Sequence, residues 1–383
     1  MRRIYLDANA TTPLLPEVLE AMRPFFLERF GNASSIHTEG QHARWAVEQA
    51  RASVARFLGC RPSEIVFTSG GTESDNLALF GSVKPGDHVI TSSVEHHAVL
   101  HAGEKLRERG VEVDFLPVDG QGVVAPEDVR QALRPNTRLI SVMMANNETG
   151  VLQPVKEIDQ IAAEAGVRFH VDAVQAAGKV PLEMDAIGCH LLSISGHKMH
   201  GPQGTGALFV RRGTRLEPLF AGGAHERQRR AGTENVAGIV GLGKAAECAM
   251  EGLLSGTPER VGALRDRLES GLLKHTTDRG VNSGAAARVP NTTNFWFDHL
   301  EGEALVIALD LKGLAVSSGA ACSSGASEPS HVLGAMGLSP ERARSSLRMS
   351  LHRQTTEEEI DRAIELVSSQ VTRLREVSAV TVR

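Results

Sequence analysis

Short apolar runs alternate with amphipathic stretches through about the first 250 residues. This alternation is typical of β-α units that build a mostly parallel sheet. Apolar residues recur at steps of three and four in the stretches 98–109, 126–133 and 154–165, which predicts helices there. We therefore expect a large α/β domain with a seven-stranded sheet flanked by helices. The seven expected strands are 64–68, 88–91, 112–118, 139–144, 167–171, 191–195 and 207–210.

A domain boundary is expected near Ser255-Gly256-Thr257-Pro258, because Thr257 can cap and Pro258 can open a new helix. The apolar face of that helix would be Val261, Leu264, Leu268 and Leu272. Further on, Thr356-Glu357-Glu358-Glu359 has the pattern of a capping box before a final helix. A chain of 383 residues has room for two domains. We expect a large domain of residues 15–255 and a smaller α+β domain of residues 1–14 and 256–383.

Composition excludes several classes of protein. A net charge of −5 and an aromatic content of 4% argue against nucleic acid as a partner, since phosphate contacts need clustered cations and base stacking needs aromatic rings. The start of the chain lacks the apolar core of a signal peptide, and no run approaches the roughly 18 apolar residues of a membrane span. The cysteines at 60, 189, 248 and 322 show no metal or disulfide spacing. We expect an enzyme of a reducing compartment, the cytoplasm, with no metal and no membrane partner.

A glycine-containing turn follows the first expected strand. It reads Thr68-Ser69-Gly70-Gly71-Thr72-Glu73-Ser74-Asp75-Asn76 and leads into a helix. Free backbone amides and the positive end of a helix dipole suit a phosphate group. The segment is neither a Walker loop nor a dinucleotide fingerprint, so a nucleotide is not specifically indicated. A capped turn without a ligand is the alternative interpretation.

An acid and a lysine follow two later strands, at Asp172 and Lys198. The carboxyl ends of parallel strands lie at one edge of a sheet, where ligands of open α/β sheets bind. Only eight of the 41 basic residues are lysines, and Lys, unlike Arg, can lose its proton and form a Schiff base. A phosphate-binding turn, an Asp and a Lys in this order indicate a pyridoxal phosphate enzyme, in which the Asp keeps the ring nitrogen protonated.

The segment around Cys322 contains almost only Gly, Ala and Ser, from Ser317 to Ser327. A thiol on such a loop has the surroundings of a reactive nucleophile. Cys189 and Cys248 are expected to be buried and inert, whereas Cys60 is left undecided. His97 and His101 could share a helix face and suggest zinc, but no HExxH pattern accompanies them.

Taken together, these residues resemble the NifS/IscS-type cysteine desulfurases, which belong to the class V aminotransferases of pyridoxal phosphate fold type I. The similarity extends over nearly the whole chain and consists of nine motifs in order. They are 5–13, 68–76, 95–99, 146–150, 170–175, 195–198, the pair 225–227 and 231–235, 322–330, and 345–348.

The resemblance implies a site and a reaction. Lys198 would form the Schiff base with pyridoxal 5'-phosphate and move the substrate Cα proton. Asp172 would pair with the pyridinium nitrogen, Gln175 would bond the phenolic oxygen and His96 would stack on the ring. Cys322 would take the sulfur of L-cysteine as a persulfide and release alanine. The phosphate would be held by Gly71, Thr72, Ser195 and His197, with Thr233 from the second subunit of a homodimer; Asn147 and Arg348 would position the substrate.

An iron–sulfur scaffold protein or another persulfide acceptor is the implied partner. The sequence departs from the family pattern at the N-terminal Asp-Ala-Asn-Ala-Thr-Thr, at His97 and at 199–203, and we expect none of these positions to touch the catalytic set. Three alternatives stay open at this point. They are another pyridoxal phosphate reaction such as that of a selenocysteine lyase or an aminotransferase, a non-catalytic scaffold that retains the site, and a metal-dependent hydrolase.

Overall fold

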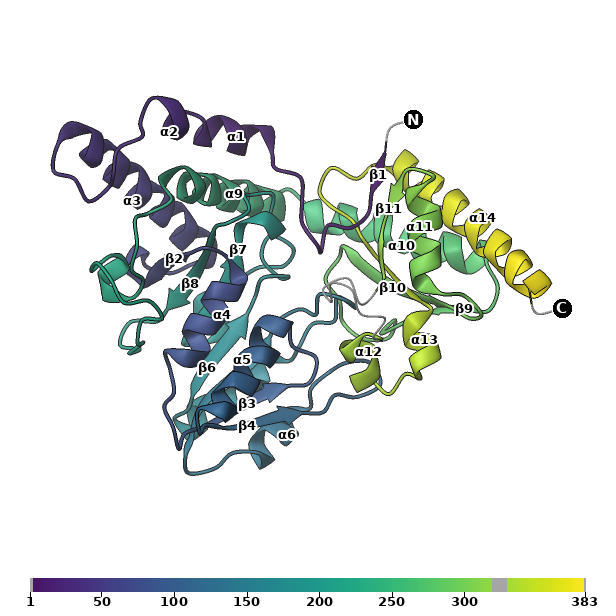
Figure 1. The fold of residues 1–383 in the computed structure, drawn as a ribbon, viewed down its shortest axis with the longest axis horizontal. Coiled ribbons are helices and arrows are strands. Elements are labelled where there is room, and N and C mark those ends of the chain that lie inside the picture. The colour runs from purple at the N-terminus through teal and green to yellow at the C-terminus, as the bar shows by residue number, and fades with distance from the viewer. Residues whose placement is uncertain (1–2, 319–328, 382–383) are drawn as a thin grey trace.

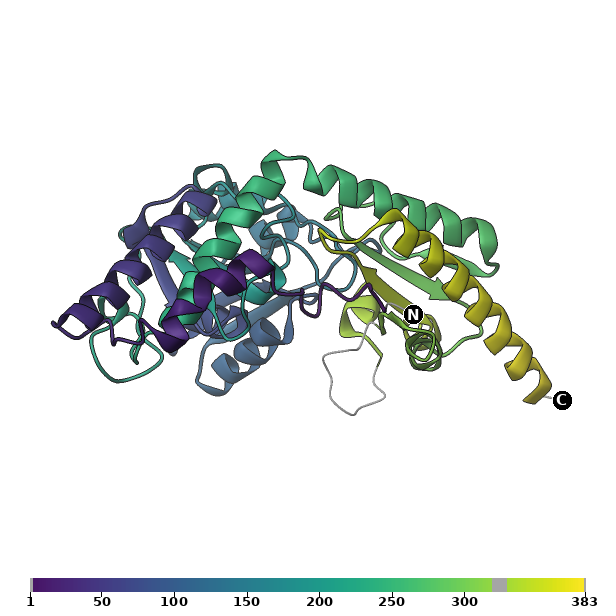
Figure 2. The same cartoon turned by 90° about the horizontal axis from the view of Figure 1, so that it is seen from above.

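The computed structural model describes residues 3–318 and 329–381. Figure 1 shows two bodies side by side, a larger one that contains the wide sheet and a smaller one that carries both ends of the described chain. The long helices α9 (Val236–Leu254) and α10 (Thr257–His275) follow one another across the junction, and Figure 2 shows α10 along the upper edge of the smaller body. Cys322 lies outside the described residues.

The larger body is built on a seven-stranded sheet with the strand order β2-β8-β7-β6-β5-β3-β4. All seven expected strands are present, with ends shifted by up to two residues. In this sheet β8 runs against the direction shared by the other six strands, so the fold prediction of a mostly parallel sheet is confirmed. The strands are β2 (Ile65–Thr68), β3 (His88–Ser92), β4 (Glu112–Leu116), β5 (Thr137–Met143), β6 (Arg168–Asp172), β7 (Leu191–Ser195) and β8 (Gly206–Val210).

Both faces of this sheet are covered, because successive side chains of a strand point to opposite faces. In β2, Ile65 and Phe67 belong to one apolar core and Val66 to another. The first core packs against α3, α7 and α9, and the second packs against α4 and α5. The helices here are α1 (Pro16–Met22), α2 (Pro24–Leu27), α3 (Thr38–Leu58), α4 (Gly71–Phe80), α5 (His97–Glu108), α6 (Pro126–Gln131), α7 (Val155–Ala165) and α8 (Met184–Ile187).

The smaller body has its own core and two small sheets. An antiparallel sheet has the order β12-β13-β10-β9, and β1 (Ile4–Tyr5) pairs in parallel with β11 (Leu314–Ala315). The side chains of Ile4 and Leu6 pack in this core, whereas Leu15 packs in the larger body. The remaining elements are β9 (Arg279–Val281), β10 (Thr292–Phe297), α11 (Gly302–Asp310), β12 (Ser317–Ser318), α12 (His331–Ala335), α13 (Pro340–Arg344), β13 (Ser346–Ser350) and α14 (Glu357–Thr381).

The expected helix starts are partly right. The apolar face of α10 is buried as predicted, and the backbone N–H of Thr356 donates to Glu359 Oε2 while the N–H of Glu359 donates to Thr356 Oγ1, which confirms the capping box. The prediction that Thr257 caps α10 is wrong. Gly256 occupies the cap position with φ of 77°, a left-handed conformation that glycine adopts without a steric penalty, and Thr257 is the first helical residue. No helix within 3–318 and 329–381 has the length and apolarity of a membrane span.

Candidate active site

The carboxyl ends of three strands of the large sheet meet the smaller body at a cavity of about 250 Å³. Of the eleven predicted site residues that the structure describes, ten line it and Thr233 does not. The turn after β2, the end of β6 and the segment after β7 therefore lie together at one edge of the sheet, as predicted. The lining residues are Asn9, Ala10, Gly71, Thr72, Asp75, His96, Met143, Asn147, Asp172, Val174, Gln175, Ser195, His197, Lys198 and Arg348.

One end of the cavity is the N-terminus of α4. Gly71 is the first helical residue, so the amides of the first turn have no partner inside the helix. A Cβ at Gly71 would lie 2.8 Å from Cγ2 of Val174, which leaves no room for a side chain there. Ser195 and His197 come from the end of β7 and the turn after it. This combination of free amides, a helix dipole and small polar groups suits a phosphate.

Asp172 ends β6 on the cavity floor with a side chain that is almost fully buried. Its Oδ1 accepts a hydrogen bond of 2.9 Å from the backbone N–H of Val174. Burial raises the pKa of this carboxyl to about 6, although the backbone hydrogen bond and the charge of Lys198 oppose the rise. A buried carboxylate in this position gains most from a cationic partner, such as a protonated ring nitrogen.

Lys198 closes the short 3-10 turn Gly196–Lys198 directly after β7. Its ammonium donates to the carbonyl oxygens of Asn9 and Ala10, the latter at 2.7 Å. These two residues belong to the Asp7–Thr11 strap, the N-terminal segment that crosses from the smaller body to the cavity. The strap therefore holds Nζ of Lys198 at the cavity wall.

Two histidines of the cavity are neutral at physiological pH. Nδ1 of His96 accepts a hydrogen bond of 3.1 Å from the N–H of Ala98, so the proton of the neutral ring sits on Nε2. Burial and the charge of Lys198 lower the pKa of His96 to about 4. The same two causes lower the pKa of His197 to about 4. A neutral ring at position 96 adds no charge over a planar ligand.

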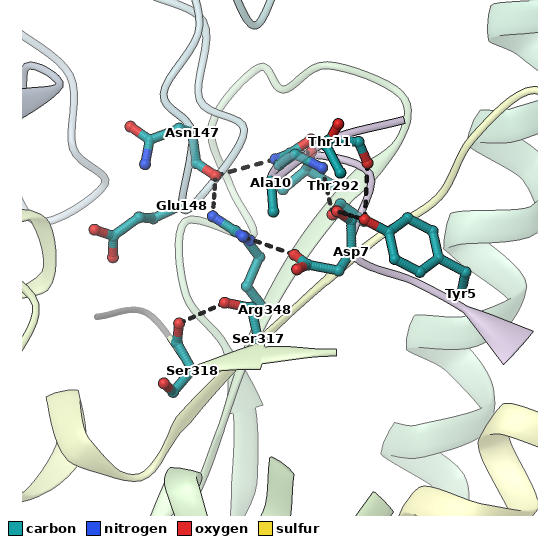
Figure 3. Close-up of polar contacts among 12 residues, drawn as sticks. Tyr5, Asp7, Ala10, Thr11, Asn147, Glu148, Thr292, Ser317, Ser318 and Arg348 are labelled. Atoms are coloured by element: carbon teal, nitrogen blue, oxygen red, sulfur yellow. Dashed lines mark hydrogen bonds and ion pairs between the residues drawn. The ribbon is translucent and has the colours of Figure 1, made fainter. Parts of the chain in front are cut away.

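The guanidinium of Arg348, on β13 of the smaller body, lies on the side of the cavity opposite the large sheet. Figure 3 shows its guanidinium between Asn147 and Asp7. One nitrogen donates to the carbonyl oxygen of Asn147 at 3.0 Å, and another forms an ion pair of 2.8 Å with Asp7. Within the described part of the chain, Nε of Arg348 and Oδ1 of Asn147 are buried without a hydrogen-bond partner. Unpaired buried polar atoms are costly, which indicates that a polar ligand completes them.

Sequence reasoning missed the strap and a second acid. The expectation that the N-terminal departure from the family pattern touches no catalytic residue is wrong, because the Asn9 carbonyl accepts from both Lys198 and Gln175. Such contacts involve backbone oxygens, which no residue pattern reveals. Asp75 also lines the cavity, one turn into α4 from Gly71, and burial raises its pKa well above the usual value. Its helical spacing from Gly71 was the available signal.

The remaining predicted residues lie elsewhere. Thr233 is exposed in the segment before α9. Cys189 and Cys248 are buried as expected; Cys60 is half-buried, and burial raises its pKa to about 12. The rings of His97 and His101 lie 5.0 Å apart. No group of three His, Cys, Asp or Glu in residues 3–318 and 329–381 is arranged to hold a metal ion.

The cavity residues fit pyridoxal phosphate. The N-terminus of α4 offers amides for its phosphate, the buried Asp172 offers a counter-charge for its ring nitrogen, and Lys198 Nζ reaches the same space. The unpaired atoms of Asn147 and Arg348 leave polar capacity for a further ligand beside it.

Comparison with known proteins agrees with this site. The aminotransferase class-V family matches residues 4–363. A cysteine desulfurase IscS from Dictyoglomus turgidum is 47% identical over 381 residues, which cover 98% of this chain and 96% of that protein. The cysteine desulfurase NifS of Azotobacter vinelandii is 48% identical over 382 residues, which cover 99% of this chain and 95% of that protein.

Solved structures of similar proteins have the same fold. A NifS-like protein superimposes with a TM-score of 0.90 at 38% identity, over 97% of this chain and all of that one. The protein SspA, solved in complex with cysteine, superimposes with a TM-score of 0.82 at 37% identity, over 92% of this chain and 100% of that one. The chain therefore belongs to the class-V aminotransferases and, among them, to the pyridoxal phosphate-dependent cysteine desulfurases of the NifS/IscS type.

Proposed function

We propose that the protein converts L-cysteine to L-alanine and holds the sulfur on Cys322 as a persulfide, for iron–sulfur cluster assembly or another acceptor. The observation that carries this proposal is the convergence of a phosphate-binding helix end, a buried carboxylate, a lysine and an arginine on one cavity. In the overall reaction the Cβ–S bond of the substrate breaks and an S–S bond to Cys322 forms. The carbon gains the two electrons that the two sulfur atoms lose, and the two thiol protons end on alanine and the persulfide.

Pyridoxal phosphate, when bound, supplies an electron sink for bond breaking at the substrate Cα and Cβ. Lys198 would hold the cofactor and then move the Cα proton through Nζ, which the strap carbonyls of Asn9 and Ala10 keep at the cavity wall. The Asp172 carboxylate would stabilise a protonated ring nitrogen. His96 would stack on the ring as a neutral imidazole.

Arg348 and Asn147 would bind the substrate. A guanidinium binds a carboxylate through two parallel hydrogen bonds. Two of the nitrogens of Arg348 already bond Asp7 and Asn147, so substrate binding would use the remaining donors, including the unpaired Nε. The ion pair with Asp7 orients the guanidinium before the substrate arrives.

The direct test is a substitution of the thiol. Cys322→Ser should retain the yellow absorbance of the cofactor-loaded protein and lose alanine and sulfide production from L-cysteine. Wild-type protein incubated with L-cysteine should carry one extra sulfur atom on the peptide that contains Cys322, measured by mass spectrometry after alkylation. Undiminished alanine production by Cys322→Ser would contradict the role of this thiol.

A homodimer would complete the phosphate site. Thr233 is exposed and does not line the cavity of its own chain, so we propose that it serves the cavity of a second copy. Exposed apolar side chains on and around α1, α2 and α3 would form part of the contact, since exposed apolar patches mark association surfaces. They are Leu19, Phe26, Leu27, Phe30, Ile36 and Trp45. In sedimentation experiments the wild type should be a dimer. The Phe30→Asp variant should shift towards the monomer.

We also propose a two-domain organisation and a cytoplasmic location. The two separate apolar cores support a large domain of 15–255 and a small domain of 1–14 and 256–383. The three described cysteines are free thiols, which supports a reducing compartment such as the cytoplasm. Limited proteolysis near Gly256 should separate two resistant fragments.

A further inference from the structure

A second lysine lies behind the cavity wall. Nζ of Lys179 donates to Oε1 of Gln175 at 2.7 Å and to Oδ1 of Asn9 at 3.4 Å. Lys179 does not line the site cavity; it borders a neighbouring cavity of about 60 Å³ between the end of α9, the start of α10 and residues 351–353. Lys179 therefore reaches the site through its hydrogen bonds to the side chains of Gln175 and Asn9.

The contacts of Gln175 fix which way its amide points. A lysine side chain is a donor towards an amide oxygen, so Oε1 faces Lys179. On the other side, Nε2 donates to the carbonyl oxygen of Asn9 at 2.9 Å. A reversed amide would place its nitrogen against the Lys179 donor and its oxygen against the Asn9 acceptor, and would lose both hydrogen bonds. Nε2 carries two hydrogens, and the one not used by Asn9 remains for a ligand.

The geometry points to Lys179 as a positioning residue that makes Gln175 present an N–H group, and not a carbonyl oxygen, to the phenolic oxygen of the cofactor. This inference rests on the proposed function, which gives Gln175 its place beside that oxygen. An N–H donor stabilises the ionised phenolic oxygen, whereas an amide oxygen would repel it. In its protonated form Lys179 also places a positive charge on the same side.

The orientation does not depend on the charge state of Lys179. Burial and the charges of Lys198 and Arg348 lower the pKa of Lys179. A neutral amine still carries N–H donors for Oε1 of Gln175, so the amide keeps its direction when Lys179 loses its proton. The other titratable groups around the neighbouring cavity are Lys198, His200, Cys248, His352 and Arg353, and burial holds the pKa values of both histidines below their usual range.

The test is a pH titration of the visible absorbance of the cofactor-loaded protein, which needs no turnover. In Lys179→Met, Oε1 of Gln175 loses its donor, and the charge that the protonated amine carries is removed. Both changes favour retention of a proton near the phenolic oxygen and Lys198, so the titration midpoint should rise by about one pH unit. Lys179→Arg keeps a donor and a charge and should titrate close to wild type. Lys156→Met, on the exposed side of α7, is the matched control and should titrate as wild type.

Gln175→Glu separates orientation from folding at position 179. The introduced carboxylate can accept from Lys179 but cannot donate to the cofactor, so the midpoint should also rise. If Lys179→Met does not fold, as judged by thermal unfolding of the cofactor-free protein, Gln175→Glu decides the question.

An unchanged midpoint in the folded variant overturns the inference. Wild-type protein that shows no visible absorbance with pyridoxal phosphate and makes no alanine from L-cysteine overturns the proposed function instead. Normal wild-type absorbance and turnover together with unshifted variants overturn the positioning role alone.

Discussion

The two walls of the site cavity are supplied by different kinds of groups. The wall formed by the large sheet consists of side chains that follow strand ends, such as Asp172, Ser195 and Lys198. The opposite wall consists of the Asp7–Thr11 strap and Arg348, which reach the cavity from the smaller body. The sheet wall carries buried carboxyl groups, and the strap wall carries a guanidinium and carbonyl oxygens.

This difference separates two tasks. The sheet wall is rigid, because its residues belong to a hydrogen-bonded sheet with apolar cores on both faces, and it matches a resident cofactor. The strap wall connects the two bodies, since the N–H of Ala8 donates to the carbonyl of Ser350 and the N–H of Thr12 to the carbonyl of His197. We expect changes on the sheet wall to act on the cofactor, and changes on the strap wall to act on the substrate.

The largest effect is expected on the sheet wall, at Lys198. Lys198→Ala removes both the attachment point and the proton carrier, so alanine production from L-cysteine should fall by a factor of about 10²–10⁴ or more. Borohydride treatment of the loaded wild type should fix the cofactor to the peptide of Lys198, and the variant should show no such product. Lys156→Ala on the surface of α7 is the control. Fixation at another lysine would contradict the assignment.

The next effect is expected on the strap wall, at Arg348. Arg348→Gln removes the guanidinium that we assign to the substrate carboxylate and leaves Asp7 without its ion pair. Loss of a charged hydrogen bond of about 1.5–3 kcal/mol should lower kcat/KM for L-cysteine about 10- to 100-fold, mainly through KM.

The cofactor absorbance of Arg348→Gln should stay as in wild type, because Arg348 is not on the sheet wall. Arg362→Gln, exposed on α14, should behave as wild type in both measurements. A variant that lost its cofactor and kept its KM would break the division between the two walls.

Substitution of Asp172 tests how much its buried carboxyl destabilises the cofactor-free protein. Its pKa is raised to about 6 in the folded protein, against about 3.9 in an unfolded chain, so the folded state binds the proton more tightly. The ionised carboxyl therefore destabilises the cofactor-free protein by up to about 3 kcal/mol. This destabilisation is absent below about pH 4 and complete above about pH 6. Asp172→Asn should be more stable than wild type at pH 8 and equal to it near pH 4, measured by denaturant unfolding without cofactor.

The same variant should bind pyridoxal phosphate more weakly, since the counter-charge for the ring nitrogen is gone. Asp185→Asn, almost fully exposed on α8, is the control and should change neither quantity. A stability difference that does not depend on pH would show that Asp172 has the same pKa in the folded and unfolded states, which would contradict the raised pKa.

The two walls also differ in how far the sequence predicts them. The strands that carry Asp172 and Lys198 were predictable, because apolar runs mark strands and the carboxyl ends of parallel strands share one edge. The contact between Asn9 and Lys198 joins residues 189 positions apart through a backbone oxygen. No local pattern encodes such a contact. The hydrogen bond between Lys179 and Gln175 was not predicted either, although the two side chains stand only four positions apart.

Local rules also failed where the backbone conformation decided the outcome. Thr257, a good capping residue, is predicted to cap α10, but the left-handed Gly256 takes the cap position and Thr257 is the first helical residue. The antiparallel direction of β8 was not predicted either. Its residues Gly206–Val210 read as a buried strand in either direction, and only the short connection from β7 through the Lys198 turn sets the orientation.

The smallest effect is expected from the strap side chain that touches both walls, Asn9. Its Nδ2 donates to the carbonyl of Asn147 at 3.0 Å and to Oγ1 of Thr292 at 2.9 Å, and its Oδ1 accepts from Asn291 at 3.1 Å. Asn9→Ala removes these bonds but keeps the backbone carbonyl that holds Lys198. We therefore expect a loss of about 1–2 kcal/mol in unfolding free energy and a decrease in kcat/KM of about tenfold or less. The decrease should appear in KM, because Asn147 would lose one of its two hydrogen bonds while Lys198 keeps its bond to the Asn9 carbonyl. Asn32→Ala, an exposed asparagine, provides the matched control in denaturant unfolding and steady-state kinetics. If Asn9→Ala instead lowered kcat and altered the cofactor absorbance, the strap would belong functionally to the sheet wall, and the two walls would act as one unit.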